Sequence, residues 1–424
     1  MKPMLNLILG MAAAISAAAC SDPVVDEPQA VEQSSSSAIV SRQEGEGADP
    51  DLFTVKRGCN LECWFSQIGN RDPDPTYYTP ETIRRLKEWG FDHIRLCVGE
   101  DKLYDDKFNR KESNWKLITD ILDECRRQDM KVIFDLQECR YWNCNHTDIS
   151  SMFYDSRTLS RLWTKYLCAD LSKYPNSFLA YDIINEPAGS AVPHKLLTWN
   201  QISADVIKAI REVEPNRTLV ICGDEWANPG DPFMQLQLPS DPHIIASVHF
   251  YQPNNLCFYR EPWSKFAQYD GPIHYPGFIL NRGEWIQWLN DWKAANPNGT
   301  LLTDFTNWTN DTYNKSAMYK ALKACKDHCD EMGVGFMLGE CGTTYYLPAD
   351  VRNAWYTDLV SVCDMLDIPY TNWGTKGNFG VYKWNGQGPE KNVFDADLTA
   401  PDKALIEILT GKPYESGIEP VRPD

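Results

Sequence analysis

The 424-residue sequence predicts an α/β protein, a single (β/α)8 TIM barrel, and three observations support this prediction. From residue 52 onward, short apolar and β-branched runs alternate with longer amphipathic stretches, a pattern typical of parallel strands joined by crossover helices. About eight such units fit the remaining length, which favours a closed barrel over an open sheet. No glycine-rich phosphate loop follows an early strand, which argues against a nucleotide-binding fold.

The boundaries of these units follow from the hydrophobic pattern. The apolar runs predict strands at Thr54–Asn60, His93–Val98, Lys131–Leu136, Phe178–Ile184, Thr218–Gly223, Ile244–His249, Gly335–Gly339 and Pro369–Trp373. The amphipathic stretches predict helices at Pro80–Trp89, Trp115–Gln128, Leu159–Ser172, Leu197–Val213, Ser316–Met332, Ala349–Met365 and Asp402–Leu409. The first helix begins with Thr79 and Pro80, an N-cap residue followed by proline at the first helical position.

One long insertion interrupts the alternation after the sixth strand. It runs from Gln252 to about Tyr313 and is rich in Trp, Tyr, Phe, Asn and Pro. This is far longer than an ordinary loop between a strand and a helix. At the catalytic end of a barrel such an insertion most often shapes a substrate cleft, and the alternative is a subunit contact or a decoration.

The N-terminus has the pattern of an export signal. A basic start precedes an apolar stretch from Leu5 to Ala19, and the small residues before Cys20 resemble a bacterial lipobox. We expect a lipoprotein-type signal peptide over 1–20, a disordered flexible linker over 21–51, and a catalytic domain over 52–424. The protein would then be an exported lipoprotein of the bacterial cell envelope or surface, touching the membrane only through its lipid anchor. Ordinary cleavage near Ala19 is the alternative.

Charge and cysteine content exclude several partners. The net charge of −18 repels phosphate backbones, so nucleic acid is not an expected partner. Removing Cys20 leaves 13 of the 14 cysteines, an odd number that requires at least one thiol without an intramolecular disulfide. Cys325, His328 and Cys329 share a helix face but have no evident fourth ligand. We therefore expect neither a metal site nor a cofactor.

Two glutamates stand where a barrel places its catalytic groups. Glu186 follows the fourth predicted strand, and Glu340 follows the apolar run of the seventh. Active sites of such barrels gather at the carboxyl ends of the strands, so both side chains would face the mouth. Two carboxyls about 5–5.5 Å apart are what retaining glycoside cleavage requires. The alternative for each glutamate is a structural ion pair at a strand end.

At these positions the sequence resembles glycoside hydrolase family 5, from Arg57-Gly58-Cys59-Asn60-Leu61 to Asn372-Trp373-Gly374. The resemblance implies that Glu186, in Asn185-Glu186-Pro187, is the acid/base and that Glu340 is the nucleophile. It further implies site roles for Arg95, His249, Tyr251 and Trp373, which match the family's motif positions. One departure is Gln137, which stands where the family usually has histidine, and His146 lies nearby in sequence as a substitute.

Each side chain has an expected chemical task. Asn185 would donate to the sugar 2-hydroxyl, a bond that strengthens in the transition state. Arg95 would keep Glu340 ionised, and Tyr251 would donate to the same carboxylate. Gln137 would hydrogen-bond a sugar or a side chain.

Glu186 must carry a proton at the working pH, and His249 would orient it or bind sugar. Alternatively, His249 is a satisfied histidine at a strand end. Trp373 would be a sugar platform or a core residue. Further platform candidates are Trp226, Trp263 and Trp384.

These assignments predict a retaining O-glycosyl hydrolase acting on a β-linked polysaccharide or oligosaccharide. Cellulase-like endo-β-1,4-glucanase activity is the first expectation. β-Mannanase, xyloglucanase and exo-β-1,3-glucanase activities of the same family remain alternatives, because loops around the barrel set specificity. A non-catalytic, glycan-binding surface lipoprotein is the alternative from another class, and the presence of both glutamates argues against it.

Overall fold

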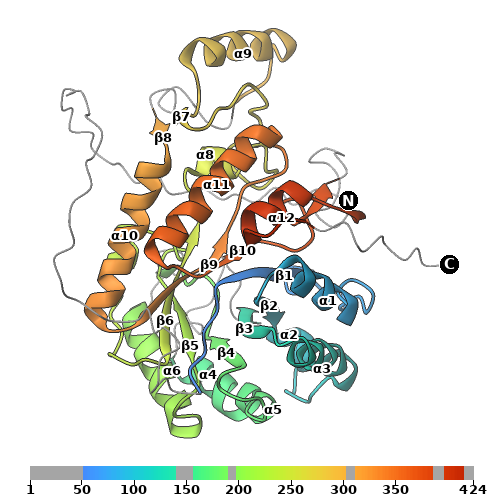
Figure 1. Cartoon of the computed structure of the whole chain (residues 1–424), viewed down its shortest axis with the longest axis vertical. Helices are drawn as coiled ribbons and strands as arrows, with labels where there is room; N and C mark the ends of the chain where they lie inside the picture. Colours follow the sequence, from blue (N-terminus) through green and yellow to red (C-terminus); the bar gives the residue numbers. More distant parts are fainter. Residues whose placement is uncertain (1–50, 140–155, 190–196, 302–310, 385–395, 415–424) are drawn as a thin grey trace. The chain divides into compact units, whose positions relative to one another are not determined.

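The computed structural model describes residues 51–139, 156–189, 197–301, 311–384 and 396–414. Eight parallel strands close into a barrel in the order β1-β2-β3-β4-β5-β6-β9-β10, with β10 paired to β1 (Figure 1). Their bounds are β1 Arg57–Phe65, β2 His93–Gly99, β3 Lys131–Glu138, β4 Leu179–Asp182, β5 Leu219–Cys222, β6 Ile244–Phe250, β9 Gly335–Cys341 and β10 Tyr370–Asn372. The predicted (β/α)8 barrel is therefore confirmed.

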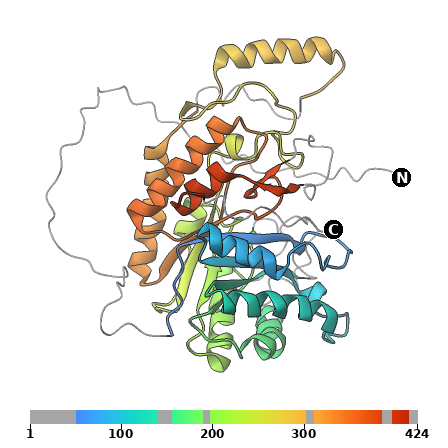
Figure 2. The ribbon, with the colours of Figure 1, turned by 45° about the vertical axis from the view of Figure 1, so that its right-hand side comes forward.

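Helices surround these strands (Figures 1 and 2). They are α1 (Pro80–Trp89), α2 (Glu100–Leu103), α3 (Glu112–Arg127), α4 (Ser156–Arg161), the π-helical η1 (Leu162–Leu167), α5 (Cys168–Leu171), α6 (Trp199–Val213), α7 (Asp231–Met234), α10 (Lys315–Met332), α11 (Ala349–Leu366) and α12 (Lys403–Thr410). A small antiparallel pair, β11 (Tyr382–Trp384) and β12 (Ala396–Pro401), precedes α12.

Most predicted elements are present, with shifted ends. The first strand begins three residues later than expected, at Arg57, and runs on to Phe65. The predicted helix Leu159–Ser172 is interrupted by the π-helical turn η1. The seventh barrel strand, β9, extends two residues past Gly339, so Glu340 lies within the strand instead of after it. Apolar content alone placed the end of β9 too early, because the polar Glu340 faces the barrel interior and still belongs to the strand.

The barrel interior is layered because alternate residues of each strand point inward. Ile133, Ala180, Val220 and Met337 come from four strands and pack together with Phe53 as one apolar cluster. Two residues further along β3 and β4, inward positions carry polar side chains in place of apolar ones. The barrel thus changes from an apolar floor to a charged layer towards the carboxyl ends of its strands.

A register shift in β9 sets the direction of its last side chains. Val248 of β6 pairs with Leu338, but the next residue, His249, pairs with Glu340, so Gly339 is the extra residue of a bulge. Bulges re-aim side chains next to active sites. A Cβ on Gly339 would lie 2.5 Å from Ser247 Oγ, so a larger residue would have to displace this buried hydroxyl, which accepts from Gly339 N at 3.1 Å.

The predicted insertion after β6 is also present. It contains α8 (Asn254–Cys257), β7 (Gly277–Phe278), α9 (Arg282–Ala295) and β8 (Thr312–Tyr313), and β7 pairs antiparallel with β8. Its start is tied to the barrel, because Trp355 Nε1 of α11 donates to the carbonyl of Gln252 at 2.9 Å.

The predicted signal peptide, Cys20 included, and all but the last residue of the predicted linker lie outside the described residues and stay predictions. Release of a Cys20→Ser variant from membranes would test the lipid anchor. Within the described ranges, no helix is long and apolar enough to cross a membrane. The twelve cysteines described there are free thiols, ten of them buried.

The bulge gives a testable consequence for stability. We expect Gly339→Ala to lower the free energy of unfolding by about 1–3 kcal/mol, because the added methyl group overpacks a closed interior. Gly335→Ala, at the start of the same strand, is the matched control. There the nearest atom to the new Cβ would be Ile245 Cγ1 at 3.1 Å, a side chain that can move. Urea unfolding of both variants measures the difference, and equal losses would contradict a special role of the bulge.

Candidate active site

Glu186 occupies a tightly held turn at the end of β4. Its backbone φ is +43°, a left-handed conformation that a non-glycine residue adopts only when its surroundings enforce it. The next residue, Pro187, accepts a hydrogen bond from Trp226 N at 3.0 Å, which ties this turn to the loop after β5. The Glu186 side chain is 17% exposed.

Glu340 is the more buried carboxyl, with 4% of its side chain exposed. Its Oε1 accepts from Arg95 Nη1 at 3.0 Å, and its Oε2 accepts from the Tyr251 hydroxyl at 2.8 Å. Burial raises the pKa of Glu340 above its ordinary value, while Arg95 and Tyr251 oppose that rise. As expected, Arg95 acts to lower the pKa of Glu340. Burial acts in the opposite direction and has the larger effect.

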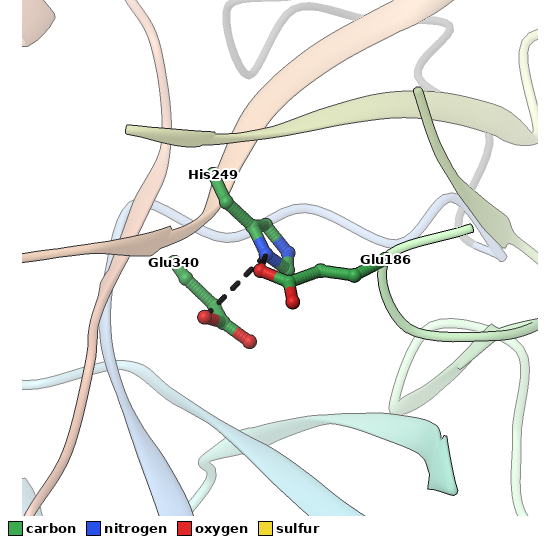
Figure 3. A group of neighbouring side chains, drawn as sticks. All are labelled: Glu186, His249 and Glu340. Carbon is green, nitrogen blue, oxygen red and sulfur yellow. Dashed lines mark hydrogen bonds and ion pairs between the residues drawn. The ribbon is translucent and has the colours of Figure 1, made fainter. Parts of the chain in front are cut away.

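His249 connects the two carboxyls (Figure 3). Its Nδ1 lies 2.7 Å from Glu186 Oε1 and 3.4 Å from Glu340 Oε2. Burial lowers the pKa of His249 to about 4, so the ring is neutral near pH 7. A neutral ring donates to Glu186 when Nδ1 carries the hydrogen, and accepts the proton of a neutral Glu186 when Nε2 carries it.

The two glutamates approach each other closely. One oxygen of each carboxyl and one nitrogen of His249 all lie within 4.8 Å of one another. Figure 3 shows the three side chains directed towards a common point.

Beneath the nucleophile candidate, Arg95 of β2 is fully buried among carboxyls. Its Nη2 lies 3.0 Å from Asp135 Oδ1 and 3.0 Å from Asp182 Oδ2. Together with Glu340, three carboxyls surround one guanidinium. Burial raises the pKa of Asp135 strongly, and Asp182 and Glu340 raise it further. Arg95 opposes this rise, and burial raises the pKa of Asp182 as well.

The same guanidinium fixes three amide side chains. Arg95 donates to Asn185 Oδ1 at 2.9 Å, to Asn60 Oδ1 at 3.1 Å and to Gln137 Oε1 at 3.4 Å. The amide nitrogen of Asn185 is therefore the end directed away from Arg95. Gln137, at the predicted position after the third strand, lies buried against the cluster. His146, the suggested substitute, lies outside the described residues.

The tryptophan candidates differ in their surroundings. Trp373 follows β10, is partly exposed, and its backbone N–H donates to the carbonyl of Cys341, next to Glu340, at 2.7 Å. Trp226 is partly exposed in the loop after β5. Trp263, in the insertion, is 54% exposed. The side chain of Trp384 lies outside the described residues.

Comparison with known proteins identifies the family. Residues 58–378 match the family model described as cellulase (glycosyl hydrolase family 5). The chain belongs to this family. It is therefore a cellulase-like glycoside hydrolase. The match spans the barrel from β1 to the loop after β10, so it includes all the side chains brought together above.

Individual relatives have low sequence identity to this chain, but the matches extend over nearly the whole length of each relative. Endoglucanase C of Acetivibrio thermocellus is 24% identical over 368 residues, which is 84% of this chain and 98% of that protein. The crystal structure of the clostridial cellulose synthase subunit Z from Clostridioides difficile has a TM-score of 0.62 at 19% identity and covers 84% of this chain and 99% of its own. Thermotoga maritima Cel5A in complex with mannotriose has a TM-score of 0.60 at 16% identity, covering 84% and 97%. These structural likenesses support the barrel fold.

Among the described residues, Glu186, His249 and Glu340 are also the group of side chains that could ligate a metal ion. Both oxygens of Glu340 already accept hydrogen bonds, from Arg95 and Tyr251. The positive charge 3.0 Å from Glu340 Oε1 disfavours a second cation there. In the glycoside hydrolase, these groups suit acid–base and nucleophilic chemistry better than metal binding. The other group considered for a metal is Cys325, His328 and Cys329 on one helix face. There, His328 Nε2 already forms a hydrogen bond with the backbone carbonyl of Leu236.

Sequence reasoning missed part of this site. Asn60, Asp135 and Asp182 complete the surroundings of Arg95, and none was singled out. A signal was present, because an aspartate inside an apolar run, at an inward position of a barrel strand, is costly unless it is paired. Glu261 in the insertion, which is fully buried, was not singled out either.

The depressed pKa of His249 predicts a pH-dependent loss of stability. Its folded-state pKa of about 4 is below the ordinary value, so the unfolded chain takes up the proton first as the pH falls. Neutral His249 therefore contributes to the free energy of unfolding fully above pH 6.5. This contribution is lost as the pH falls towards 4, at up to about 1.4 kcal/mol per pH unit. We expect His249→Asn to flatten this dependence and exposed His274→Asn to leave it unchanged. Urea unfolding between pH 4 and 7 measures it, and parallel curves for all three proteins would disprove the assignment.

Proposed function

We propose that this glycoside hydrolase cleaves β-1,4-linked glucans internally, as an endo-β-1,4-glucanase, and retains the anomeric configuration. The approach of one oxygen from each of Glu186 and Glu340 to within 4.8 Å carries the mechanistic part of the proposal. Retaining enzymes have carboxyls about 5–5.5 Å apart, and inverting enzymes have them about 6.5–9.5 Å apart.

In the first step, a carboxylate oxygen of Glu340 attacks the anomeric carbon. The bond from that carbon to the leaving oxygen breaks, and Glu186 gives its proton to that oxygen. Arg95 and Tyr251 hold the attacking carboxylate in place through their hydrogen bonds at 3.0 and 2.8 Å. A glycosyl ester on Glu340 results.

In the second step, water replaces the first sugar product. Glu186, now a carboxylate, takes a proton from the water, whose oxygen attacks the anomeric carbon and releases Glu340. Neutral His249 supports both states of Glu186, since its Nδ1 either accepts from the acid or donates to the carboxylate. The 17% exposed fraction of the Glu186 side chain lets water reach it.

Two further groups would hold the sugar. Arg95 fixes the oxygen end of Asn185, so that its amide nitrogen would donate to the 2-hydroxyl of the reacting unit. Trp373, partly exposed beside the Glu340 strand, would stack on the apolar face of a sugar ring. Gln137 would act mainly by supporting Arg95, because it lies buried against it.

The substrate assignment follows the relatives. Endoglucanase C supports a β-glucan, and the mannotriose complex of Cel5A favours mannan as the second candidate. We expect faster release of reducing ends from carboxymethyl-cellulose than from mannan, with a rapid fall in viscosity as the sign of internal cleavage. Preference for mannan, xyloglucan or β-1,3-glucan would replace the glucan assignment and leave the mechanism untouched.

Azide separates the roles of the two glutamates. With a good aryl leaving group, Glu186→Ala should still form the glycosyl ester but hydrolyse it slowly, because water lacks its base. Azide needs no base, so it should restore turnover and give a glycosyl azide of retained configuration. Removal of this general acid–base should cost about 10²–10⁴-fold on unactivated substrate.

Glu340→Ala is the matched variant, and azide should replace the missing nucleophile and give the inverted product. Nuclear magnetic resonance of the two azides reads the configuration. Exchanged configurations would reverse the two roles, and inversion by the unaltered enzyme would refute retention.

A further inference from the structure

We propose that Asp224, in the loop after β5, is a positioning residue that holds Glu186 in place for proton transfer to the leaving oxygen. This inference rests on the proposed function, because it explains how the acid/base carboxyl of that mechanism is kept in position. The loop comprises residues 224–228 and follows directly on the buried end of β5.

The backbone of this loop has an unusual conformation. Three consecutive residues, Glu225, Trp226 and Ala227, have φ angles of +58°, +61° and +52°. Left-handed backbone is sterically unfavourable for residues that carry a side chain, so a run of three requires contacts that enforce it. Asn228 provides one such contact at the end of the run, because its Nδ2 donates to the carbonyl of Glu225 at 2.8 Å. Asp224 provides another at the start.

One carboxylate oxygen of Asp224 joins two loops of the barrel. Its Oδ1 accepts from the backbone N–H of Glu225 at 2.9 Å and from the backbone N–H of Gly189 at 2.7 Å. Gly189 follows Glu186 by three residues in the chain. The Asp224 side chain therefore ties the segment after the acid/base group to the start of the left-handed run.

The left-handed run in turn contacts both members of the acid/base pair through the backbone. Trp226 N donates to the carbonyl of Pro187, the residue after Glu186, at 3.0 Å. The carbonyl of Ala227 accepts from His249 N at 2.8 Å, and the His249 ring lies 2.7 Å from Glu186 Oε1. A change in this loop would therefore displace Glu186 and His249 relative to each other.

The effect of Asp224 should be confined to one of the two catalytic carboxyls. Without its carboxylate, two backbone N–H groups lose their acceptor, and the turn that holds Glu186 at a φ of +43° loses part of its support. Glu340 is held by donors from other parts of the barrel and should stay in place. Displacement of a reacting group by about 1 Å can cost about 10²-fold in rate.

The test uses a series of aryl β-cellobiosides whose leaving groups differ in basicity. The value of kcat/KM reports the steps up to formation of the glycosyl ester, so the later role of Glu186 as a base does not enter. A poor leaving group needs the proton of Glu186, and a dinitrophenolate does not. Asp224→Ala should lower kcat/KM about 10- to 100-fold for the poorest leaving group and less than about threefold for dinitrophenolate. The plot of log kcat/KM against leaving-group pKa should thus become steeper and approach that of Glu186→Ala.

Three further variants serve as controls. Asp224→Asn keeps an oxygen that can accept both hydrogen bonds, so its slope should return close to that of the unaltered enzyme. Asp231→Ala removes an exposed carboxylate at the start of α7 and should leave the slope unchanged. The double variant of Asp224→Ala with Glu186→Ala should lose no more than Glu186→Ala alone, because both act on the same proton transfer.

An equal fall of kcat/KM for all leaving groups in Asp224→Ala would indicate a general structural role and overturn the inference, as would an unchanged slope. If Asp224→Ala fails to fold, Asn228→Ala decides, since it removes the other side-chain bond to the run: a steeper slope supports the inference and an unchanged slope overturns it. A slope in Glu186→Ala equal to that of the unaltered enzyme would instead refute the acid/base of the proposed function, so the two failures are distinguishable.

Discussion

The catalytic arrangement depends on the burial of one guanidinium. Arg95 is fully enclosed in the barrel and contacts Asp135, Asp182 and Glu340 at 3.0 Å each. A buried cation needs paired anions. The cost of removing each of these carboxyls from water is in turn offset only because the Arg95 guanidinium lies beside it. The cluster therefore joins strands β2, β3, β4 and β9 across the barrel. Arg95 opposes the effect of burial on the pKa of Glu340 and so favours its carboxylate form.

The carboxyl of Glu186 is held in a different way. Glu186 lies in a left-handed turn, and its oxygen meets His249, whose backbone N–H is bonded to the loop after β5. The bulge at Gly339 brings Glu340 alongside His249 from the other strand. One carboxyl is thus buried and held by strong donors, while the other is accessible to water. The donors to Glu340 favour its anion against the effect of burial, while the exposed part of Glu186 lets this group exchange protons with water.

Much of this could be predicted from the sequence, because the barrel and the ends of its strands follow from hydrophobic periodicity. Glu186 and Glu340 were found from their place after apolar runs. The partners of Arg95 were not, because Asp135 and Asp182 lie inside such runs and only the closure of the barrel brings them together. Glu261 could not be found either, since its contacts join segments far apart in the chain.

The most direct test of the account is to trap the glycosyl ester. Incubation with an activated 2-deoxy-2-fluoro-β-cellobioside should inactivate the enzyme, because the fluorine slows hydrolysis of the ester more than the departure of an activated leaving group. Mass spectrometry of the intact protein should show the addition of one fluorocellobiosyl group, and peptide mapping should place it on Glu340. An adduct on another residue, or steady turnover with inversion and no adduct, would contradict the account.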